Sequence, residues 1–236
     1  MQLIFIRHGE PDYSIDSLTP KGWREAELLG PRVAKWDVKE FYVSPLGRAQ
    51  DTASPAMKLT GRTPVIKEWL HEFDPPMKPG YEGRRGIVWD IMPEIWTNQP
   101  EMLTLEHWFD APVYEAREVR QEYLRVTGEM DKLLAEHGYV RDGQLYRVTR
   151  SNDDTLVFFC HLGITCVMLG HLLSIPASVA LHSFFLPTTS VTALATEERQ
   201  GNAAKFRLQC AGDTRHLREA GEPVSQAGGY AQLFQD

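Results

Sequence analysis

The sequence predicts an α/β fold, a three-layer α/β/α sandwich with a mostly parallel central sheet. Short apolar runs at residues 2–6, 41–43 and 155–160 have the length and composition of buried strands. Amphipathic helical patterns separate these runs, and this alternation is typical of a parallel sheet covered on both faces. With 236 residues the chain can bury a full core, so we expect one domain over residues 1–236.

Local signals define the elements of the first third. Thr19 is expected to cap a helix over residues 20–36, because Pro20 suits the first helical position. A second helix should run from residue 45 to 59 and end at Gly61. The pair Val65-Ile66 predicts a short strand.

Residues 73–113 have a different character. Prolines interrupt them repeatedly, yet the segment holds Tyr81, Trp89, Trp96 and Trp108. A long proline-rich stretch with so many aromatic residues is more typical of a folded insertion than of disorder. We therefore expect a cap that determines substrate specificity.

The rest of the chain again alternates helices and strands. The elements expected are a helix over 114–137, a hairpin over 139–146, a helix over 163–173, a strand over 190–195 and an edge strand over 206–208.

Composition limits the possible partners. A net charge of −7 disfavours nucleic acid and anionic membranes. No apolar run reaches the length of a membrane helix, and no signal peptide is visible. The three cysteines form no disulfide framework, so we expect a cytoplasmic protein.

Two of the predicted buried strands end at a histidine. Arg7-His8-Gly9 follows the first strand, and His161 follows the strand over 155–160. The carboxyl ends of parallel strands meet at one edge of a sheet, and Arg48 and Glu72 are expected at the same edge. Each of these residues alone would be unremarkable, but two imidazoles and two guanidiniums together suit a dianionic phosphoryl group.

These residues could divide the chemistry among them. One neutral histidine could act as the nucleophile while the other donates to the phosphoryl oxygens. Glu72 could protonate the leaving oxygen if burial keeps it protonated near neutral pH. Glu10, Asp12 and Glu82 are alternative acids, although Glu10 is better placed to orient the turn that binds phosphate.

Four motifs resemble those of the histidine phosphatase superfamily, the phosphoglycerate mutase-like proteins. They are Arg-His-Gly-Glu at 7–10, Ser-Pro-Leu-Gly-Arg-Ala at 44–49, Leu-Thr at 18–19 with the following helix, and His-Leu-Gly at 161–163. The strand over 187–194 resembles the last core strand of that family. The motifs occur in the family's order, which makes the resemblance specific.

The resemblance implies a reaction in two steps through phosphohistidine at His8, without a metal or other cofactor. It implies that Glu72 acts as acid and then as base. Phosphoryl binding is implied for Arg7, Arg48 and His161, with contributions from the backbone of Gly9 and Leu162. Ser14 stands where the family has an asparagine, which implies a contact of Ser14 with phosphate. Leu162 replaces a glycine and narrows the pocket.

The expected activity is hydrolysis of a small phosphate monoester, so the partner is a small phosphorylated metabolite. A cofactor-dependent phosphoglycerate mutase is the alternative. Lys78, Arg84 and Arg85 could bind a second anion or form a solvated basic stretch.

Three further hypotheses carry less weight. A non-catalytic phosphate-binding module would lack one of the catalytic groups, and all of them are present. The histidines at 161, 171 and 182 do not match a common zinc spacing, so no metal site is expected. An exposed edge strand or the aromatic cap would suit a homodimer.

Overall fold

The computed structural model describes residues 1–77, 86–114, 117–199 and 201–229. Within them, eight strands form one twisted sheet in the order β5-β4-β8-β1-β9-β10-β7-β6. The strands are β1 (Gln2–Arg7), β4 (Glu40–Val43), β5 (Val65–Ile66), β6 (Tyr139–Asp142), β7 (Leu145–Val148), β8 (Thr155–Cys160), β9 (Val191–Arg199) and β10 (Ala203–Asp213). A separate small ribbon pairs β2 (Pro11–Asp12) with β3 (Ser17–Leu18).

The α/β class is confirmed, and the sheet has two halves of different character. Strands β5, β4, β8 and β1 run parallel, as the sequence predicts. From β1 through β9, β10, β7 and β6 every pairing is antiparallel, so the whole sheet is mixed rather than mostly parallel. The parallel half contains the strands that end at His8 and His161, and it positions the site.

The strand expected at residues 206–208 is confirmed, as part of the longer β10. Residues 206–208 pair with β9 on one side, whereas β7 pairs with β10 only at its start. The predicted hairpin forms as β6 and β7, and its β7 strand pairs with β10 at Ala203 and Ala204. Such a long-range pairing leaves no signal in the local pattern of either strand.

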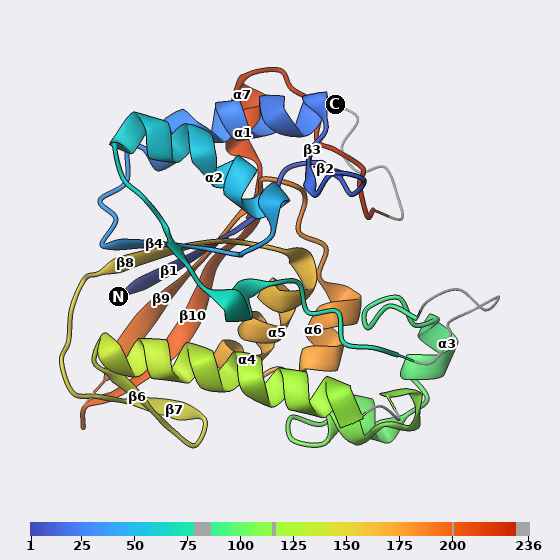
Figure 1. The fold of residues 1–236 in the computed structure, drawn as a ribbon. Coiled ribbons are helices and arrows are strands. Elements are labelled where there is room, and N and C mark those ends of the chain that lie inside the picture. Colours follow the sequence, from blue (N-terminus) through green and yellow to red (C-terminus); the bar gives the residue numbers. More distant parts are fainter. Residues whose placement is uncertain (78–85, 115–116, 200, 230–236) are drawn as a thin grey trace.

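Helices cover both faces of the sheet (Figure 1). On one face lie α1 (Pro20–Val33), α2 (Gly47–Thr60) and α7 (Arg215–Glu219), and on the other α4 (Arg117–Glu136), α5 (Leu162–Leu173) and α6 (Ala177–Ser183). The predicted cap of α1 is confirmed, because the Thr19 side chain accepts a hydrogen bond from the Gly22 amide. Helix α2 begins at Gly47, two residues later than expected.

Side chains of β1 alternate between the two layers of the core. Leu3 and Phe5 pack among residues of α4 and α5, whereas Ile4 and Ile6 pack against α1 and α2. All four are less than a tenth exposed. Because both faces of this strand are buried, its end is held rigidly, and His8 follows directly.

The described part of residues 73–113 is folded, with short helical turns in place of long elements. These are α3 (Pro93–Trp96) and the 3-10 turns η3 (Pro100–Leu103), η4 (Trp108–Asp110) and η5 (Pro112–Tyr114). Trp108 is fully buried and meets Tyr114 and Tyr123 edge-to-face at 5.4 and 5.2 Å between ring centroids. Aromatic packing therefore gives this segment a core continuous with the main one.

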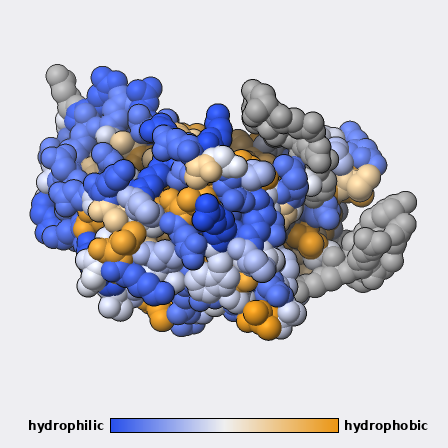
Figure 2. Space-filling model, turned by 90° about the horizontal axis from the view of Figure 1, so that it is seen from above, coloured by the Kyte–Doolittle hydropathy of each residue, from blue (hydrophilic) through white to orange (hydrophobic). Residues whose placement is uncertain are grey.

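The surface above α1, α2 and α7 is mainly hydrophilic, with scattered apolar side chains (Figure 2). No helix among the described residues has the length and apolarity needed to cross a membrane.

Candidate active site

His8 is presented as a neutral imidazole with one nitrogen free. Its Nδ1 lies 2.7 Å from the Gly9 carbonyl oxygen. A carbonyl can only accept, so Nδ1 carries the proton and the lone pair is on Nε2. Burial, together with the charges of Arg7 and Arg48, lowers the pKa of His8 to about 3. At neutral pH the side chain is therefore an uncharged imidazole with a lone pair on Nε2, which is the state that a nucleophile needs.

His161 faces His8, with 5.1 Å between the ring centroids. Its Nε2 lies 2.7 Å from Oγ of Ser44, and that hydroxyl also accepts a hydrogen bond from the Leu46 amide. The arrangement that satisfies most donors has Ser44 donating to Nε2, which places the His161 proton on Nδ1. Burial, the His8 ring and the nearby arginines lower the pKa of His161 well below its usual value. His161 is thus a neutral donor.

Hydrogen bonds hold the guanidiniums of Arg7 and Arg48 in place. Arg7 donates from Nη1 to the Leu186 carbonyl at 2.7 Å, and Arg48 donates from Nη1 to Oδ1 of Asp16 at 2.6 Å. Both side chains are largely buried, and both act on the pKa of His8. These contacts fix the two cations beside His8.

Three buried donor nitrogens of this cluster have no hydrogen-bond partner among the described residues. They are Nε of Arg7, Nε of Arg48 and Nδ1 of His161. Buried polar atoms are rarely left unsatisfied, and each such group costs about 1–3 kcal/mol. Together with the lone pair on Nε2 of His8, these three unsatisfied donors suit an anionic ligand with several oxygens.

The carboxyl group of Glu72 lies beside the first turn of α5, close enough to Arg7 for the two charges to interact. Its Oε1 accepts hydrogen bonds from the amides of Phe73 and Ile164, at 2.8 and 2.9 Å. Burial raises the pKa of Glu72, while the amides of Ile164, Phe73 and Gly163 oppose that shift. The raised pKa favours a protonated carboxyl, as a general acid requires.

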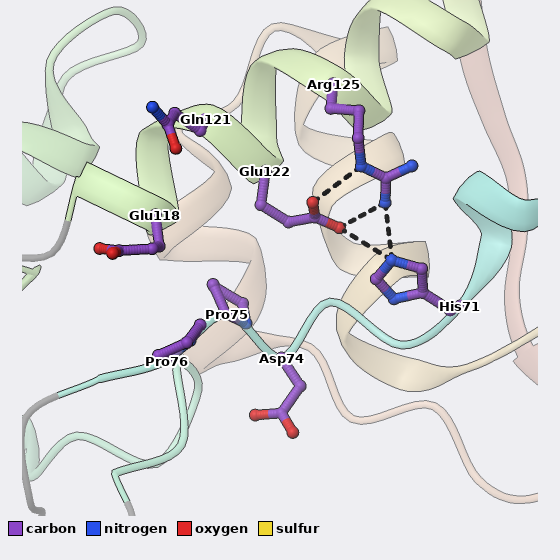
Figure 3. Close-up of a pocket in the computed structure, with 8 residues that line it drawn as sticks. All are labelled: His71, Asp74, Pro75, Pro76, Glu118, Gln121, Glu122 and Arg125. Carbon is purple, nitrogen blue, oxygen red and sulfur yellow. Dashed lines mark hydrogen bonds and ion pairs between the residues drawn. The ribbon is translucent and has the colours of Figure 1, made fainter.

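A pocket lies beside the segment that carries Glu72 (Figure 3). Within it Arg125 donates from Nη2 to Nε2 of His71 at 2.8 Å, so the His71 proton is on Nδ1, which donates to the Glu72 carbonyl at 2.8 Å. Glu122 holds Arg125 through both carboxylate oxygens. Helix α4 therefore supports the backbone at Glu72.

The turn after His8 is fixed by hydrogen bonds to α1 and α2. The Gly9 amide donates to Oγ1 of Thr52 at 2.9 Å, and the Glu10 amide donates to Oε2 of the buried Glu25 at 2.9 Å. The first of these bonds leaves the Gly9 amide no free donor for an anion. A β-carbon on Gly9 would lie 2.8 Å from the Gly22 carbonyl oxygen, so glycine is needed for close packing against α1.

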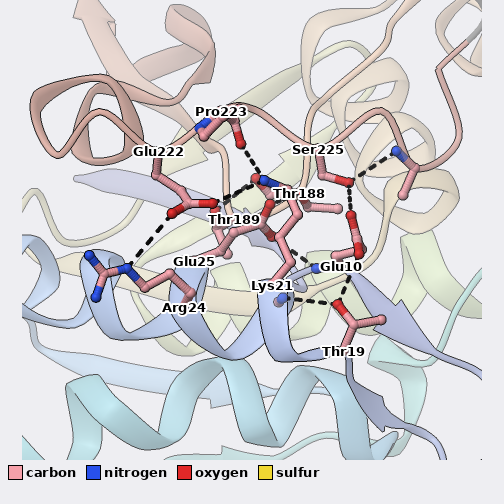
Figure 4. A network of polar contacts seen from close by, with 12 residues as sticks. Glu10, Thr19, Lys21, Arg24, Glu25, Thr188, Thr189, Glu222, Pro223 and Ser225 are labelled. Carbon is pink, nitrogen blue, oxygen red and sulfur yellow. Dashed lines mark hydrogen bonds and ion pairs between the residues drawn. The ribbon is translucent and has the colours of Figure 1, made fainter.

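The C-terminal segment, residues 222–229, runs across this turn (Figure 4). Glu222 pairs with Lys21 at 3.1 Å, and Ser225 donates to Oε2 of Glu10 at 2.5 Å. The Ala227 carbonyl accepts from Nη2 of Arg7 at 3.3 Å. This support for Arg7 comes from the far end of the sequence.

The structure brings together His8, His161, Arg7, Arg48 and Glu72, as the sequence predicts. Leu162 is buried at the first position of α5. Ser14 instead is exposed, and its hydroxyl donates to Oδ1 of Asp12 at 2.5 Å. Lys78, Glu82, Arg84 and Arg85 lie outside the described residues.

The other histidines considered for a metal site lie in separate contacts. Nε2 of His171 lies 2.9 Å from both carboxylate oxygens of Asp131, and His182 stacks on Trp96.

Supporting residues were missed by sequence reasoning. Ser44 lies in a recognised motif, which could have signalled it. Glu25 and Ala227 carry no comparable local signal, because their contacts are made by distant parts of the chain.

Comparison with known proteins agrees with this geometry. A sequence profile of the histidine phosphatase superfamily (branch 1) matches residues 3–209. The chain belongs to the histidine phosphatase superfamily. A 2,3-bisphosphoglycerate-dependent phosphoglycerate mutase of Thermoplasma acidophilum is 42% identical over 60 residues, which cover 21% of this chain and 30% of that protein.

Solved structures share the fold at low sequence identity. Phosphoserine phosphatase of Entamoeba histolytica, in complex with 3-phosphoglyceric acid, has a TM-score of 0.61 and 20% identity, covering 92% of this chain and 98% of its own. Mycobacterial glucosyl-3-phosphoglycerate phosphatase has a TM-score of 0.61 and 19% identity, covering 89% and 98%. Membership of the superfamily supports an enzyme of the phosphomonoesterase or mutase type, and the solved structures show the shared fold.

Proposed function

We propose that this histidine phosphatase hydrolyses a small phosphate monoester through a phosphohistidine at His8. The observation that carries the proposal is the free Nε2 of His8 surrounded by orphaned donors on Arg7, Arg48 and His161. Such donors fit the phosphoryl oxygens and stabilise the charge that they carry in the transition state.

In the first step Nε2 of His8 attacks phosphorus, and the bond from phosphorus to the ester oxygen breaks. Glu72 gives its proton to that oxygen, and the alcohol leaves. The proton stays on Nδ1 and continues to donate to the Gly9 carbonyl. This hydrogen bond stabilises the imidazolium of the phosphohistidine.

In the second step the carboxylate of Glu72 takes a proton from water as the water oxygen attacks phosphorus. The phosphorus–nitrogen bond breaks, inorganic phosphate leaves, and His8 becomes neutral again. Glu72 ends the cycle protonated, so no group is consumed.

A phosphoglycerate mutase is the second candidate, favoured by the 60-residue similarity to the Thermoplasma enzyme. It would share the first step, but a hydroxyl of phosphoglycerate would replace water as the acceptor.

The unpaired cysteines suit the cytoplasm, where we propose that the protein acts on a phosphorylated metabolite.

The test is to trap the phosphoenzyme during turnover of a phosphate monoester and to repeat the assay with His8→Ala. We expect an acid-labile phosphoenzyme in the native protein and loss of both label and turnover in the variant. Normal turnover by His8→Ala would overturn the mechanism. A parallel assay of 3-phosphoglycerate, with and without 2,3-bisphosphoglycerate, would reveal isomerisation if the protein is a mutase.

A further inference from the structure

Trp89 lies beside the acid. A β-carbon placed on Gly163 would lie 2.4 Å from Cζ3 of Trp89 and 2.9 Å from Oε1 of Glu72. The indole edge and the carboxyl group therefore both lie close to the position that a side chain on Gly163 would occupy. A general acid must lie within hydrogen-bond reach of the leaving oxygen, so the group attached to that oxygen has to pass close to Trp89.

The backbone around Trp89 is anchored in the cap. The preceding residue, Val88, is fully buried, and its carbonyl accepts a hydrogen bond from the Tyr114 hydroxyl at 2.9 Å. Tyr114 in turn packs against Trp108. A side chain supported in this way offers a preformed surface, which limits the entropy cost of binding.

Two further aromatic rings flank the phosphate-binding arginines. The Tyr13 ring centre lies 5.4 Å from the Arg48 guanidinium carbon, and the Phe185 ring centre lies 5.8 Å from that of Arg7. Tyr13 is 71% exposed and Phe185 37% exposed, so both rings are accessible to a ligand. Tyr13 comes from the β2–β3 ribbon and Phe185 from the segment after α6.

We propose that Trp89, Tyr13 and Phe185 form a subsite for a planar apolar leaving group, so that the preferred substrates are phosphate esters of aryl-substituted alcohols. The proposal rests on the phosphatase function proposed above. Trp89 provides the face against which the ring stacks, because it stands next to the acid. Tyr13 lies over the guanidinium of Arg48, and Phe185 lies over that of Arg7.

The substrate test compares 2-phenylethyl phosphate with propyl phosphate. Both release a primary alcohol of similar acidity, so a difference in kcat/KM reports on binding of the ring and not on leaving-group reactivity. We expect the native protein to prefer the phenyl ester roughly tenfold, as stacking on an aromatic face predicts. A ratio near one, or a higher kcat/KM for 3-phosphoglycerate than for the phenyl ester, would overturn the subsite.

The variant test uses this ratio as the readout, because a ratio does not depend on how much of the protein is folded. Trp89→Ala should bring the ratio close to one, and Trp89→Phe should retain most of the preference. Trp36→Ala is the matched control, since Trp36 follows α1 and packs against the core on the other side of the sheet. A ratio unchanged by Trp89→Ala would contradict the proposal.

Binding of 2-phenylethylphosphonate and propylphosphonate, measured by calorimetry, separates the subsite from the chemistry. If neither ester is hydrolysed but the phenyl compound binds more tightly in a Trp89-dependent manner, the proposed function has failed and the subsite stands. Equal binding of the two phosphonates overturns the subsite. Turnover without any phenyl preference leaves the phosphatase function intact and refutes only the inference drawn from Trp89.

Discussion

The ends of the parallel strands and the cap segment contribute to one site by different physical means. At the strand ends, polar side chains are buried and each is fixed by a short hydrogen bond, as His161 is by Ser44. In the cap, aromatic rings pack on one another, and the Tyr114 hydroxyl provides a polar anchor at Val88. The first region is built to hold charge and protons, whereas the second is built to present a surface.

This difference separates the chemistry from the specificity. A hydrogen-bonded donor has one useful geometry, so a change at the strand ends should reduce kcat equally for esters of different shape whose leaving groups have the same acidity. A packed aromatic surface discriminates by shape and area, so a change in the cap should alter the relative rates of different substrates. The following substitutions test this division.

The largest effect is expected from Glu72→Gln. The amide cannot supply a proton, so kcat for an alkyl phosphate should fall about 10²–10⁴-fold. The loss should be much smaller in the phosphorylation step with p-nitrophenyl phosphate, whose leaving group needs no proton. Burst kinetics with both esters measure the difference. Glu68→Gln, at an exposed carboxylate nearby, is the control, and equal losses with the two esters would contradict the role of Glu72 as acid.

The next effect is expected from Ser44→Ala. Without the hydroxyl, His161 is free to adopt the other tautomer, and its Nδ1 no longer points a fixed proton at the phosphoryl group. Losing such an orienting partner typically costs about 10–100-fold, here in kcat and for all esters alike. Ser54→Ala removes a hydroxyl from α2 that donates to the Asp51 carbonyl, and it should leave kcat unchanged. A loss of kcat in Ser44→Ala that differs between esters would contradict the assignment of chemistry to the strand ends and specificity to the cap.

The two regions also differ in how much of them could be predicted from the sequence. The strand ends could be predicted, because His8 and His161 each follow an apolar run and the motifs name Arg48. Their supports could not, since Glu25 meets Glu10 and Ala227 meets Arg7 only through the tertiary fold. For the cap, proline and tryptophan content predicted order but not which ring faces the site.

The pH dependence of stability should come mainly from the strand ends. The pKa of His8 is lowered to about 3 by burial and the nearby arginines. Between about pH 6.5 and 3 the unfolded chain binds a proton that the folded site rejects, so stability is complete above this window and falls as the pH is lowered through it. Each such histidine contributes at most about 1.4 kcal/mol per pH unit.

Urea unfolding of the native protein and His8→Asn at pH 7, 6 and 5 tests this expectation. The variant should lose less stability between pH 7 and 5 than the native protein does. His107→Asn is the control, because His107 lies in the cap and its side chain is 70% exposed. Parallel curves for the native protein and His8→Asn would show that His8 is not held neutral by its surroundings.

The smallest effect is expected from Tyr114→Phe, at the residue that directly follows the cap and anchors it. Removing the hydroxyl leaves the buried Val88 carbonyl without its donor, which should cost about 1–2 kcal/mol of stability. Since Val88 holds the backbone next to Trp89, KM for 2-phenylethyl phosphate should rise a few-fold while kcat stays close to the native value. Tyr139→Phe removes a comparable hydroxyl from β6, where it donates to Glu198, and should lower stability without changing KM. If Tyr114→Phe lowered kcat for every ester instead, the cap would support the catalytic groups themselves, and chemistry and specificity would not be divided between the two regions.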